Sequence, residues 1–374
     1  MMPRVLILAR SLGMGGTERQ LVLLANGLAH AGYRVALALF YDEGELKDAL
    51  QGVRCRILGK RGRFDLYPAL RGLRRLIMGE RASILYSFLT VPNIFNSIVI
   101  RLIPRGLRPV SLWGVRSTNM TDGDYDPISK FSYRVQDFLR YFPDRIVVNS
   151  FSGREYLLSK GYSDKKILVI HNGIDTGHFR FDSVLREKFR RKYGIAENVT
   201  AIGSVARLDP MKGYETLIGA FSLLTKKADT VYLVIKGHGH PQYVNKIKRL
   251  IDDYNIGSRV KWVDKSEDVV AVYSGIDVFC LASRYGEGFS NAIAEAMSTG
   301  LPCVATDVGD SRTILGNYGR IVPPNDQGAL INALREEVLK WKRGSKGRTT
   351  GRQHIQDRFS VESMIEQHRQ LFEG

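Results

Sequence analysis

Residues 283–312 read Ser-Arg-Tyr-Gly-Glu-Gly-Phe-Ser-Asn-Ala-Ile-Ala-Glu-Ala-Met-Ser-Thr-Gly-Leu-Pro-Cys-Val-Ala-Thr-Asp-Val-Gly-Asp-Ser-Arg. The apolar run 277–282 just before them predicts a buried parallel strand that ends at a polar, glycine-bearing turn. From Phe289 the apolar residues follow helical spacing, and Gly300 with Pro302 ends the predicted helix. A second buried strand follows over 303–306. This order is typical of an open α/β sheet, in which ligands bind outside the carboxyl ends of the strands.

Two carboxylates in this stretch are candidate binding groups: Glu287 in the predicted loop and Glu295 on the predicted helix. On one helix they would lie ~12 Å apart at ~1.5 Å per residue. Because Glu287 precedes the helix, it can fold back over the helix start, where backbone N–H groups of Gly288, Phe289 and Ser290 face an anion. Carboxylates bind vicinal hydroxyls, so the set fits a nucleotide sugar. Taken singly, either glutamate is more often a solvated residue.

The residues around the two glutamates carry a resemblance to a known family. Glu-Gly-Phe-Ser at 287–290, the seven residues between the glutamates, and Gly-Leu-Pro-Cys-Val-Ala-Thr-Asp-Val-Gly at 300–309 resemble the donor-site signature of retaining glycosyltransferases of family 4. The resemblance implies the GT-B architecture, two Rossmann-like, doubly wound α/β domains facing across a cleft. It also implies a nucleoside-diphosphate sugar as donor, with UDP the favoured nucleotide, and no metal ion or other cofactor.

The length of the chain also predicts two domains, because 374 residues exceed the size at which a single core keeps growing. His171-Asn-Gly-Ile-Asp175 matches the inter-domain hinge of the family, and the strand–helix alternation restarts at Thr200. We therefore expect an N-terminal domain over 1–172 and a nucleotide-sugar-binding domain over 173–357. By resemblance, a C-terminal helix over 358–374 returns to the first domain.

Cysteine usage and hydropathy indicate a cytoplasmic protein. Cys55, Cys280 and Cys303 have no metal-ligand spacing, and the last two lie in strand-like runs, as core thiols of a reducing compartment do. The opening apolar run 5–9 is closed by Arg10 and is too short for a signal-peptide core, so it predicts a first strand. No apolar run approaches the length of a bilayer span, and we expect a protein that is not integral to a membrane.

The net charge of +17 is unevenly distributed along the sequence. Residues 1–170 hold 26 Lys and Arg against 14 Asp and Glu, and the rest hold 29 against 24. Such asymmetry suggests a polyanionic neighbour. Eight basic residues within 54–75 lie opposite apolar residues at helical spacing, as in an ordinary packed surface helix or a helix resting on anionic lipid, where each cation contributes ~1 kcal/mol. No recognised nucleic-acid-binding motif accompanies the charge, so no nucleic acid is expected.

Gly13-Met-Gly-Gly-Thr-Glu18 forms a glycine-rich turn between the first strand and a helix predicted from about residue 18 to 30. Such a turn lets the backbone approach a phosphate, although a plain tight turn has the same residues. The dinucleotide spacing is incomplete, and no acidic residue ends the second strand. In the resembled family this turn lines the cleft beside donor phosphate and acceptor. Gly15 and Gly16 match its donor-side positions, and Glu18 is a candidate on the acceptor side.

The strand predicted over 109–115 leads into two further acceptor-side candidates, Arg116 and Asn119. Many family members carry His where Arg116 stands, so the group that polarises the acceptor is left open. The acids of 122–126 resemble a metal-binding Asp-x-Asp motif, but they lie in a polar loop before a helix, and metal binding is not expected there.

Arg207 and Lys212 flank a turn at the carboxyl end of the strand predicted over 201–206. Arg can bind two phosphate oxygens at once and Lys supplies a compact charge, which suits a diphosphate, although solvated loop cations are common. The family shares the order Arg, Lys-Gly, then Glu and Glu about eighty residues later. Gly237 follows the strand 231–236 at the same predicted edge and is a further donor-side candidate.

Together these residues predict a retaining hexosyltransferase. Arg207 and Lys212 would stabilise the leaving diphosphate, Glu287 would bind the sugar and Glu295 the ribose. The acceptor would be a hydroxyl, with a lipid-linked glycan at the cytosolic membrane face as one candidate, in glycan or envelope polysaccharide synthesis. The alternatives are a nucleotide-sugar epimerase of the same fold and a cationic nucleic-acid or lipid-surface binding protein with vestigial sites. The missing fingerprint disfavours a dinucleotide oxidoreductase.

Overall fold

A computed structural model of the chain divides into two compact units. The structure describes residues 2–60, 62, 65–116, 127–226, 230–342 and 351–374. Unit 1 comprises residues 1–173 and 361–374, and unit 2 comprises residues 174–360. Of the residues singled out above, Asn119 and the acids of 122–126 lie outside the described residues.

Unit 1 is built on a seven-stranded sheet in which every neighbouring pair is parallel, with strand order β3-β2-β1-β4-β5-β6-β7. The order reverses between β1 and β4, which makes their carboxyl ends a topological switch point, where open α/β sheets bind ligands. The strands are β1 Arg4–Ala9, β2 Arg34–Leu39, β3 Arg54–Ile57, β4 Ile84–Phe88, β5 Val110–Val115, β6 Arg145–Val148 and β7 Ile167–Val169.

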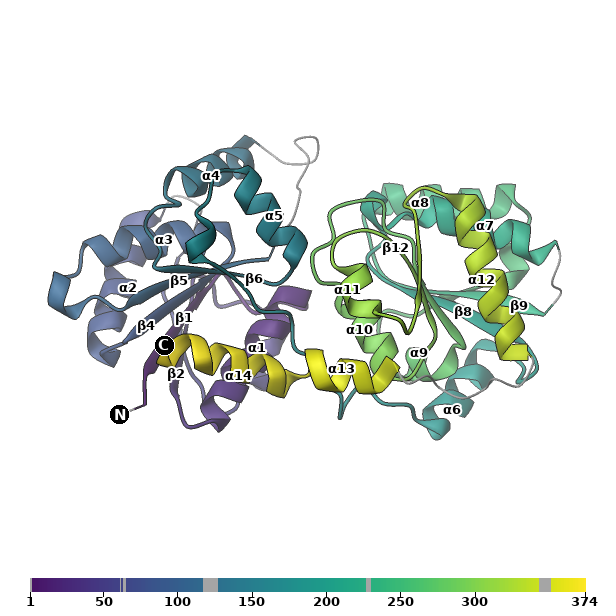
Figure 1. Ribbon diagram of the computed structural model, residues 1–374, viewed down its shortest axis with the longest axis horizontal. Helices are drawn as coiled ribbons and strands as arrows, with labels where there is room; N and C mark the ends of the chain where they lie inside the picture. The colour runs from purple at the N-terminus through teal and green to yellow at the C-terminus, as the bar shows by residue number, and fades with distance from the viewer. Residues whose placement is uncertain (1, 61, 63–64, 117–126, 227–229, 343–350) are drawn as a thin grey trace. The chain divides into compact units, whose positions relative to one another are not determined.

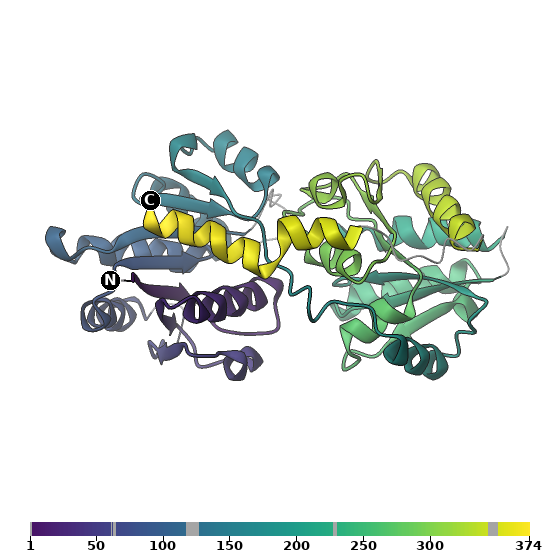
Figure 2. The same cartoon turned by 60° about the horizontal axis from the view of Figure 1, so that its bottom comes forward.

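Helices cover both faces of the unit 1 sheet (Figure 1). Helices α1 and α14 pack together on one face, and α2 and α3 bury their apolar residues against the other. Figure 2 shows α14, the last helix of the chain, alongside α1. The helices are α1 Gly16–His30, α2 Leu66–Glu80, α3 Thr90–Arg101, α4 Pro127–Phe138, α5 Phe151–Ser159 and α14 Val361–Glu373, with short 3-10 turns η1 Glu45–Ala49, η2 Arg105–Leu107 and η3 Asp164–Lys166.

Unit 2 repeats this plan with a six-stranded parallel sheet of order β10-β9-β8-β11-β12-β13. Its switch point lies between β8 and β11. The strands are β8 Thr200–Val205, β9 Val231–Lys236, β10 Val260–Val263, β11 Val278–Leu281, β12 Cys303–Thr306 and β13 Arg320–Val322. Both β11 and β12 are buried along their whole length, as their apolar runs predict.

The helices of unit 2 form two layers, one on each face of the sheet (Figure 1). Apolar residues of α6, α9, α10, α11 and α13 fill one core, and those of α7, α8 and α12 fill the other. The bounds are α6 Ser183–Tyr193, α7 Tyr214–Thr225, α8 Pro241–Asp253, α9 Val269–Gly275, α10 Asn291–Ser298, α11 Ser311–Leu315, α12 Gln327–Lys342 and α13 Gly351–Phe359, with 3-10 turns η4 Pro210–Lys212 and η5 Gly257–Arg259.

Two helices begin later than the sequence predicts. Helix α10 starts at Asn291 rather than at Phe289, because Ser290 is its N-cap and Phe289 still belongs to the preceding loop. Helix α14 starts at Val361 rather than at residue 358. The reason is that Phe359 ends α13 and is 2% exposed in the core of unit 2, where its carbonyl accepts from Ile174 N at 2.7 Å.

The described cysteines are free thiols, and Cys280 and Cys303 lie in the core as expected. Burial raises the pKa of the Cys280 thiol to about 12, so it stays protonated at neutral pH. In the described part of the chain, no helix combines the length and the apolar character needed to cross a bilayer.

Candidate active site

The centre of the candidate site is an ion pair between two loops of unit 2. Lys212 lies in the turn after β8, and Glu287 lies in the loop after β11, the neighbouring strand across the switch point. Lys212 Nζ lies 2.5 Å from Glu287 Oε1, and Ser283 Oγ donates to the same oxygen at 2.6 Å. The side chain of Lys212 is only 15% exposed, and that of Glu287 is only 7% exposed. The sheet topology thus brings together two residues that are distant in sequence.

The charge of Glu287 is fixed by its neighbours. Burial alone would raise the pKa of this carboxyl, but the attraction and hydrogen bond of Lys212, the hydrogen bond of Ser283 and the charge of Arg207 together hold the pKa below its ordinary value of 4.5. Glu287 is therefore an anion at neutral pH. A buried, ionised carboxylate of this kind is a strong acceptor for sugar hydroxyls.

Two glycines allow the loops of the site to approach each other closely. Gly213 has φ +63°, and a Cβ there would lie 2.0 Å from the carbonyl oxygen of Ala282 at the end of the β11 run. Beside it, Arg284 N donates to Met211 O at 2.7 Å. At Gly237, after β9, a Cβ would lie 1.9 Å from the carbonyl oxygen of Ala206. Gly213 and the predicted donor-side residue Gly237 thus each let two neighbouring loops come into contact.

Arg207 lies beside the ion pair without joining it. Its side chain is 62% exposed; one guanidinium nitrogen lies 3.7 Å from the sulfur of Met211 and 4.0 Å from Asp209 Oδ2. Because its charge still lowers the pKa of Glu287, the guanidinium lies within electrostatic range of the carboxylate. Because this guanidinium is exposed and its ion pair with Asp209 is long, an incoming anion can reach it at little cost.

Glu295 is buried on α10 and accepts from the hydroxyl of Tyr273, on α9, at 3.0 Å. Sequence reasoning missed Tyr273, because an aromatic residue on an apolar helix usually belongs to the core. Gly288 O accepts from Asp310 N at 3.0 Å, which ties the loop after β11 to the one after β12. Phe289 packs its ring against Phe359 with centroids 5.3 Å apart, so its side chain serves the core, and any donor contact would come from its backbone.

In unit 1 the glycine turn precedes α1, with Gly15 as N-cap and Gly16 as first helical residue. The carboxylate of Glu18 folds over this turn, since a Cβ on Gly15 would lie 2.0 Å from Glu18 Oε2. A carboxylate near a helix start is electrostatically favourable. Because Glu18 covers the turn, this arrangement suits a hydroxyl better than a phosphate.

Arg116 directly follows β5, its guanidinium is turned inward, and its Nη1 donates to Asn172 Oδ1 at 2.9 Å. Its Cζ lies 5.1 Å from the ring centroid of Phe88. Burial lowers the pKa of the guanidinium, against the opposing influence of Tyr86. Nearby, the hydroxyl of Tyr86 lies 3.4 Å from Nε2 of His368 on α14. Arg116 is thus joined to the interior of unit 1.

Two family models match the chain, one to each half. Residues 185–353 match the model described as glycosyl transferases group 1, and residues 14–178 match the model of glycosyltransferase family 4. The chain belongs to glycosyltransferase family 4. The two Rossmann-like units agree with the GT-B architecture expected from the sequence.

Curated relatives of this family 4 chain act on several acceptors. A GDP-mannose-dependent alpha-(1-6)-phosphatidylinositol monomannoside mannosyltransferase of Mycobacterium tuberculosis is 26% identical over 193 residues, 49% of each chain. The chain thus matches about half the length of that relative. The UDP-Gal:alpha-D-GlcNAc-diphosphoundecaprenol alpha-1,3-galactosyltransferase of Escherichia coli is 26% identical over 277 residues, 71% of this chain and 69% of that protein.

Solved structures share the fold over the whole chain. Anabaena HepE in complex with UDP superposes with a TM-score of 0.84 at 20% identity, covering 99% of both chains. WaaG, a glycosyltransferase involved in lipopolysaccharide biosynthesis, has a TM-score of 0.74 at 15% identity and covers 99% of this chain and all of WaaG. At these identities the likeness concerns the fold.

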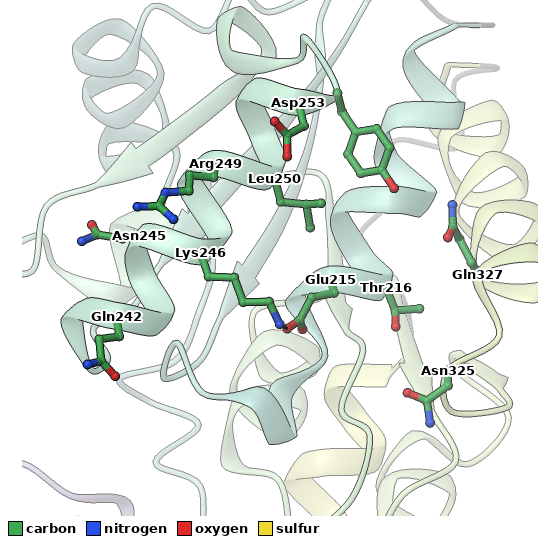
Figure 3. Close-up of a pocket in the computed structure, with 11 residues that line it drawn as sticks. Glu215, Thr216, Gln242, Asn245, Lys246, Arg249, Leu250, Asp253, Asn325 and Gln327 are labelled. Carbon is green, nitrogen blue, oxygen red and sulfur yellow. Dashed lines mark hydrogen bonds and ion pairs between the residues drawn. The ribbon is translucent and has the colours of Figure 1, made fainter.

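A polar hollow of about 740 Å³ lies on unit 2 apart from the predicted residues of this family 4 chain (Figure 3). Helices α7 and α8 and the segment that begins α12 supply its lining. Its charges balance, with Glu215 and Asp253 against Lys246 and Arg249, and Glu215 and Lys246 pair at 2.9 Å. A diphosphate needs surplus positive charge, which this hollow does not offer.

Proposed function

We propose that this protein is a retaining hexosyltransferase that moves a sugar from a nucleoside-diphosphate sugar to a hydroxyl acceptor. The observation that carries the proposal is the Lys212–Glu287 pair at the carboxyl ends of two neighbouring strands, with exposed Arg207 beside it. A buried carboxylate for hydroxyls and two cations for phosphates are the groups that a nucleotide sugar requires.

Each of these groups would bind the part of the donor that suits its chemistry. Arg207 and Lys212 bind the diphosphate, and their charges stabilise it as it leaves, which is the main electrostatic contribution to such a reaction. Glu287 accepts hydrogen bonds from the hydroxyls of the transferred sugar. Glu295, oriented by the hydroxyl of Tyr273, binds the ribose.

The bond changes need no nucleophile from the enzyme. The acceptor oxygen bonds to the anomeric carbon on the face from which the diphosphate departs, which retains the anomeric configuration. The C–O bond to the diphosphate breaks with its electron pair, and the leaving phosphate oxygen takes the acceptor proton. Positioning of the two substrates supplies much of the rate. The proposed reaction includes neither a metal ion nor a further cofactor.

UDP is the nucleotide we favour. HepE, of the same fold, is described in complex with UDP and with UDP-glucose, and the Escherichia coli relative is a UDP-Gal enzyme. The mycobacterial relative uses GDP-mannose, so the base is an open part of the proposal. The acceptor we propose is a lipid-linked glycan or its precursor, as the names of both relatives support, in glycan or envelope polysaccharide synthesis.

We propose that the protein acts at the cytosolic face of the membrane as a peripheral protein, and that α4 makes the contact. Helix α2, the basic helix of the sequence, buries its apolar stripe in the core of unit 1, so that stripe is not available to lipid. Helix α4 instead exposes Phe131 and Phe138 beside Lys130 and Arg134. Exposed aromatic rings among cations suit an anionic bilayer surface.

A thermal-shift screen of nucleotide sugars with different bases and sugars, followed by turnover assays, tests this function. We expect one donor to raise the melting temperature and to yield an α-linked or β-linked product that keeps the donor configuration. Conversion of that donor to its C2 epimer without acceptor would instead establish the epimerase. Salt-dependent oligonucleotide binding without any donor effect would contradict the enzymatic function.

A further inference from the structure

The polar hollow on unit 2 has the size of a ligand site. Its volume of about 740 Å³ lies within the range of ~300–1,000 Å³ that is usual for small-molecule pockets. Figure 3 shows side chains of α8 on one side of the hollow, Asn325 and Gln327 on the other side, and the Lys246–Glu215 pair between them. The hollow therefore lies between α7, α8 and the start of α12, within unit 2.

Contacts with α7 hold two of the lining side chains in place. A Cβ on Gly219 of α7 would lie 2.8 Å from Gln327 Oε1, so the missing side chain lets the Gln327 amide lie against that helix. The carboxylate of Glu215 accepts from the hydroxyl of Tyr243 at 2.8 Å and from Lys246 Nζ at 2.9 Å. Burial raises the pKa of Glu215, but the hydrogen bonds from Lys246 and Tyr243 hold the pKa below its ordinary value of 4.5. Part of the lining is thus oriented before any ligand arrives, which lowers the cost of binding.

The lining favours a neutral ligand that carries many hydroxyl groups. The two acids of the lining balance its two bases, so the hollow offers no net charge to an anion or a cation. Amide side chains both donate and accept hydrogen bonds, as hydroxyl groups do. Four amides line the hollow, namely Gln242, Asn245, Asn325 and Gln327.

Two charged groups and one aromatic ring are available to such a ligand. Within the described chain, Arg249 and Asp253 make no ion pair or side-chain hydrogen bond. Tyr254, at the end of α8, is 44% exposed and lines the same hollow. An aromatic ring offers a flat apolar surface with a polar hydroxyl at its tip. A sugar has the matching surfaces, because its C–H groups form an apolar face and its hydroxyls form a polar rim.

We propose that the polar hollow binds a neutral oligosaccharide. The ring of Tyr254 covers the apolar face of one sugar, and the carboxylate of Asp253 accepts from its hydroxyls in charge-assisted hydrogen bonds. The inference goes beyond the proposed function, because it adds a saccharide site that shares no residue with the candidate active site. The two sites are nevertheless neighbours. Asn325 of the hollow accepts from Arg284 Nε at 2.8 Å, and Arg284 lies in the loop that carries Glu287.

Binding to the full chain tests the site without any need for turnover. Calorimetric titrations with neutral trisaccharides of glucose, galactose, mannose and N-acetylglucosamine would compare the natural chain with Asp253→Ala and Tyr254→Ala. The matched control is Asp252→Ala, which removes the adjacent exposed carboxylate of α8, outside the lining of the hollow. Because these side chains are exposed, the variants should melt as the natural chain does.

We expect the natural chain to bind one or more of the trisaccharides. Asp253→Ala should bind about 10- to 100-fold more weakly, the loss typical of a hydrogen bond to a charged group. Asp252→Ala should bind as the natural chain does. Tyr254→Phe, which keeps the ring, should bind more tightly than Tyr254→Ala. Equal affinities in Asp253→Ala, Tyr254→Ala and the natural chain would overturn the proposal, and so would the absence of binding to all four trisaccharides up to about 10 mM.

A variant of the donor loop separates this site from the candidate active site. Glu287→Gln removes the carboxylate that would bind the transferred sugar, and it should leave trisaccharide affinity unchanged if the saccharide lies in the hollow. Loss of binding in Glu287→Gln with none in Asp253→Ala would place the saccharide at the donor loops and overturn the inference. A chain that transfers no sugar from any donor, yet loses trisaccharide affinity in Asp253→Ala, would contradict the proposed function while the saccharide site stands.

Discussion

At the scale of single residues, the Lys212–Glu287 pair combines chemistry with stability. Lys212→Ala removes the cation that would stabilise the leaving diphosphate, and we expect turnover to fall about 10²- to 10³-fold. It also leaves a buried carboxylate without its partner, so the free energy of unfolding should fall by about 3 kcal/mol. Turnover assays and urea unfolding measure the two effects.

The double variant Lys212→Met/Glu287→Gln separates the two effects of Lys212. It removes both charges, so it should regain most of the lost stability while turnover stays low. Near-normal turnover of Lys212→Ala, once its folded fraction is taken into account, would exclude the proposed role of this lysine.

The sequence selects the residues of the candidate donor site, which stay a prediction, but it does not predict the contacts that orient their side chains. Lys212 and Glu287 are found because their spacing follows a family pattern, and the parallel sheet brings the two loops together. The Tyr273–Glu295 hydrogen bond escapes prediction, because it depends on the packing of α9 against α10. The position of the Glu18 carboxylate over Gly15 likewise depends on a side-chain conformation, which a residue pattern does not specify.

At the scale of elements, the turn between β8 and α7 depends on one glycine. Gly213→Ala forces a side chain into a left-handed backbone and against the Ala282 carbonyl oxygen, so the Lys212 turn must move away from the β11 loop. Gly194 at the end of α6 is a matched control, with φ +62° and nothing within 4 Å of the added Cβ. We expect Gly194→Ala to lower the free energy of unfolding by about 1 kcal/mol and to leave donor affinity unchanged. Gly213→Ala should lower the free energy of unfolding by more than that and raise the donor KM at least tenfold. If the two variants had equal effects in the unfolding and donor assays, this account would be contradicted.

The last helix, α14, is attached to unit 1 through a buried histidine. His368 is fully buried, its Nδ1 lies 2.8 Å from Met364 O, and burial lowers the pKa of its imidazole to about 3. In the unfolded chain the imidazole takes a proton near pH 6.5, its ordinary value. Above that pH the group is neutral in both states and its contribution is constant. Between about 6.5 and 3 only the unfolded chain binds the proton, so stability falls by about 1.4 kcal/mol per pH unit as the pH drops.

His368→Leu should therefore reduce the acid sensitivity of unit 1. Between pH 7 and pH 5 we expect the natural chain to lose about 2 kcal/mol more than the variant. Urea unfolding followed by the fluorescence of Trp113, with Trp262 and Trp341 replaced by Phe, reports unit 1. His30→Leu, which removes an exposed imidazole of α1, is the control. Equal losses in His368→Leu and the natural chain would show that His368 does not titrate in this way.

Element boundaries show where prediction from the sequence stops. Buried strands such as β11 and β12 follow directly from apolar runs, because both faces of a parallel sheet are covered. The starts of α10 and α14 do not follow from the apolar pattern. Phe289 and Phe359 continue the helical spacing, yet their rings contact each other in the core of unit 2. That contact joins segments far apart in sequence.

At the scale of the whole molecule, the returning helix changes how charge is divided. With residues 361–374 included, unit 1 holds 27 basic and 17 acidic residues, and unit 2 holds 28 and 21. The surplus of ten against seven is much more even than the two halves of the sequence suggest. Net charge therefore does not single out unit 1 as the membrane-binding unit. The proposed membrane contact therefore rests on the aromatic rings of α4, because Phe131 is 66% and Phe138 is 75% exposed on the same helix.

If α4 contacts lipid, the rings rather than the charge should decide the affinity. We expect Phe131→Ala/Phe138→Ala to reduce partitioning into anionic vesicles by about tenfold per ring, because each ring loses about 1.5 kcal/mol of apolar burial. Flotation with phosphatidylglycerol vesicles at low and high salt measures the partitioning. Tyr254→Ala is the matched control, since it removes an exposed ring from unit 2. Cations should contribute in addition, so the remaining binding of the double variant should vanish at high salt. Unchanged flotation of the double variant, or an equal loss in Tyr254→Ala, would rule out α4 as the contact.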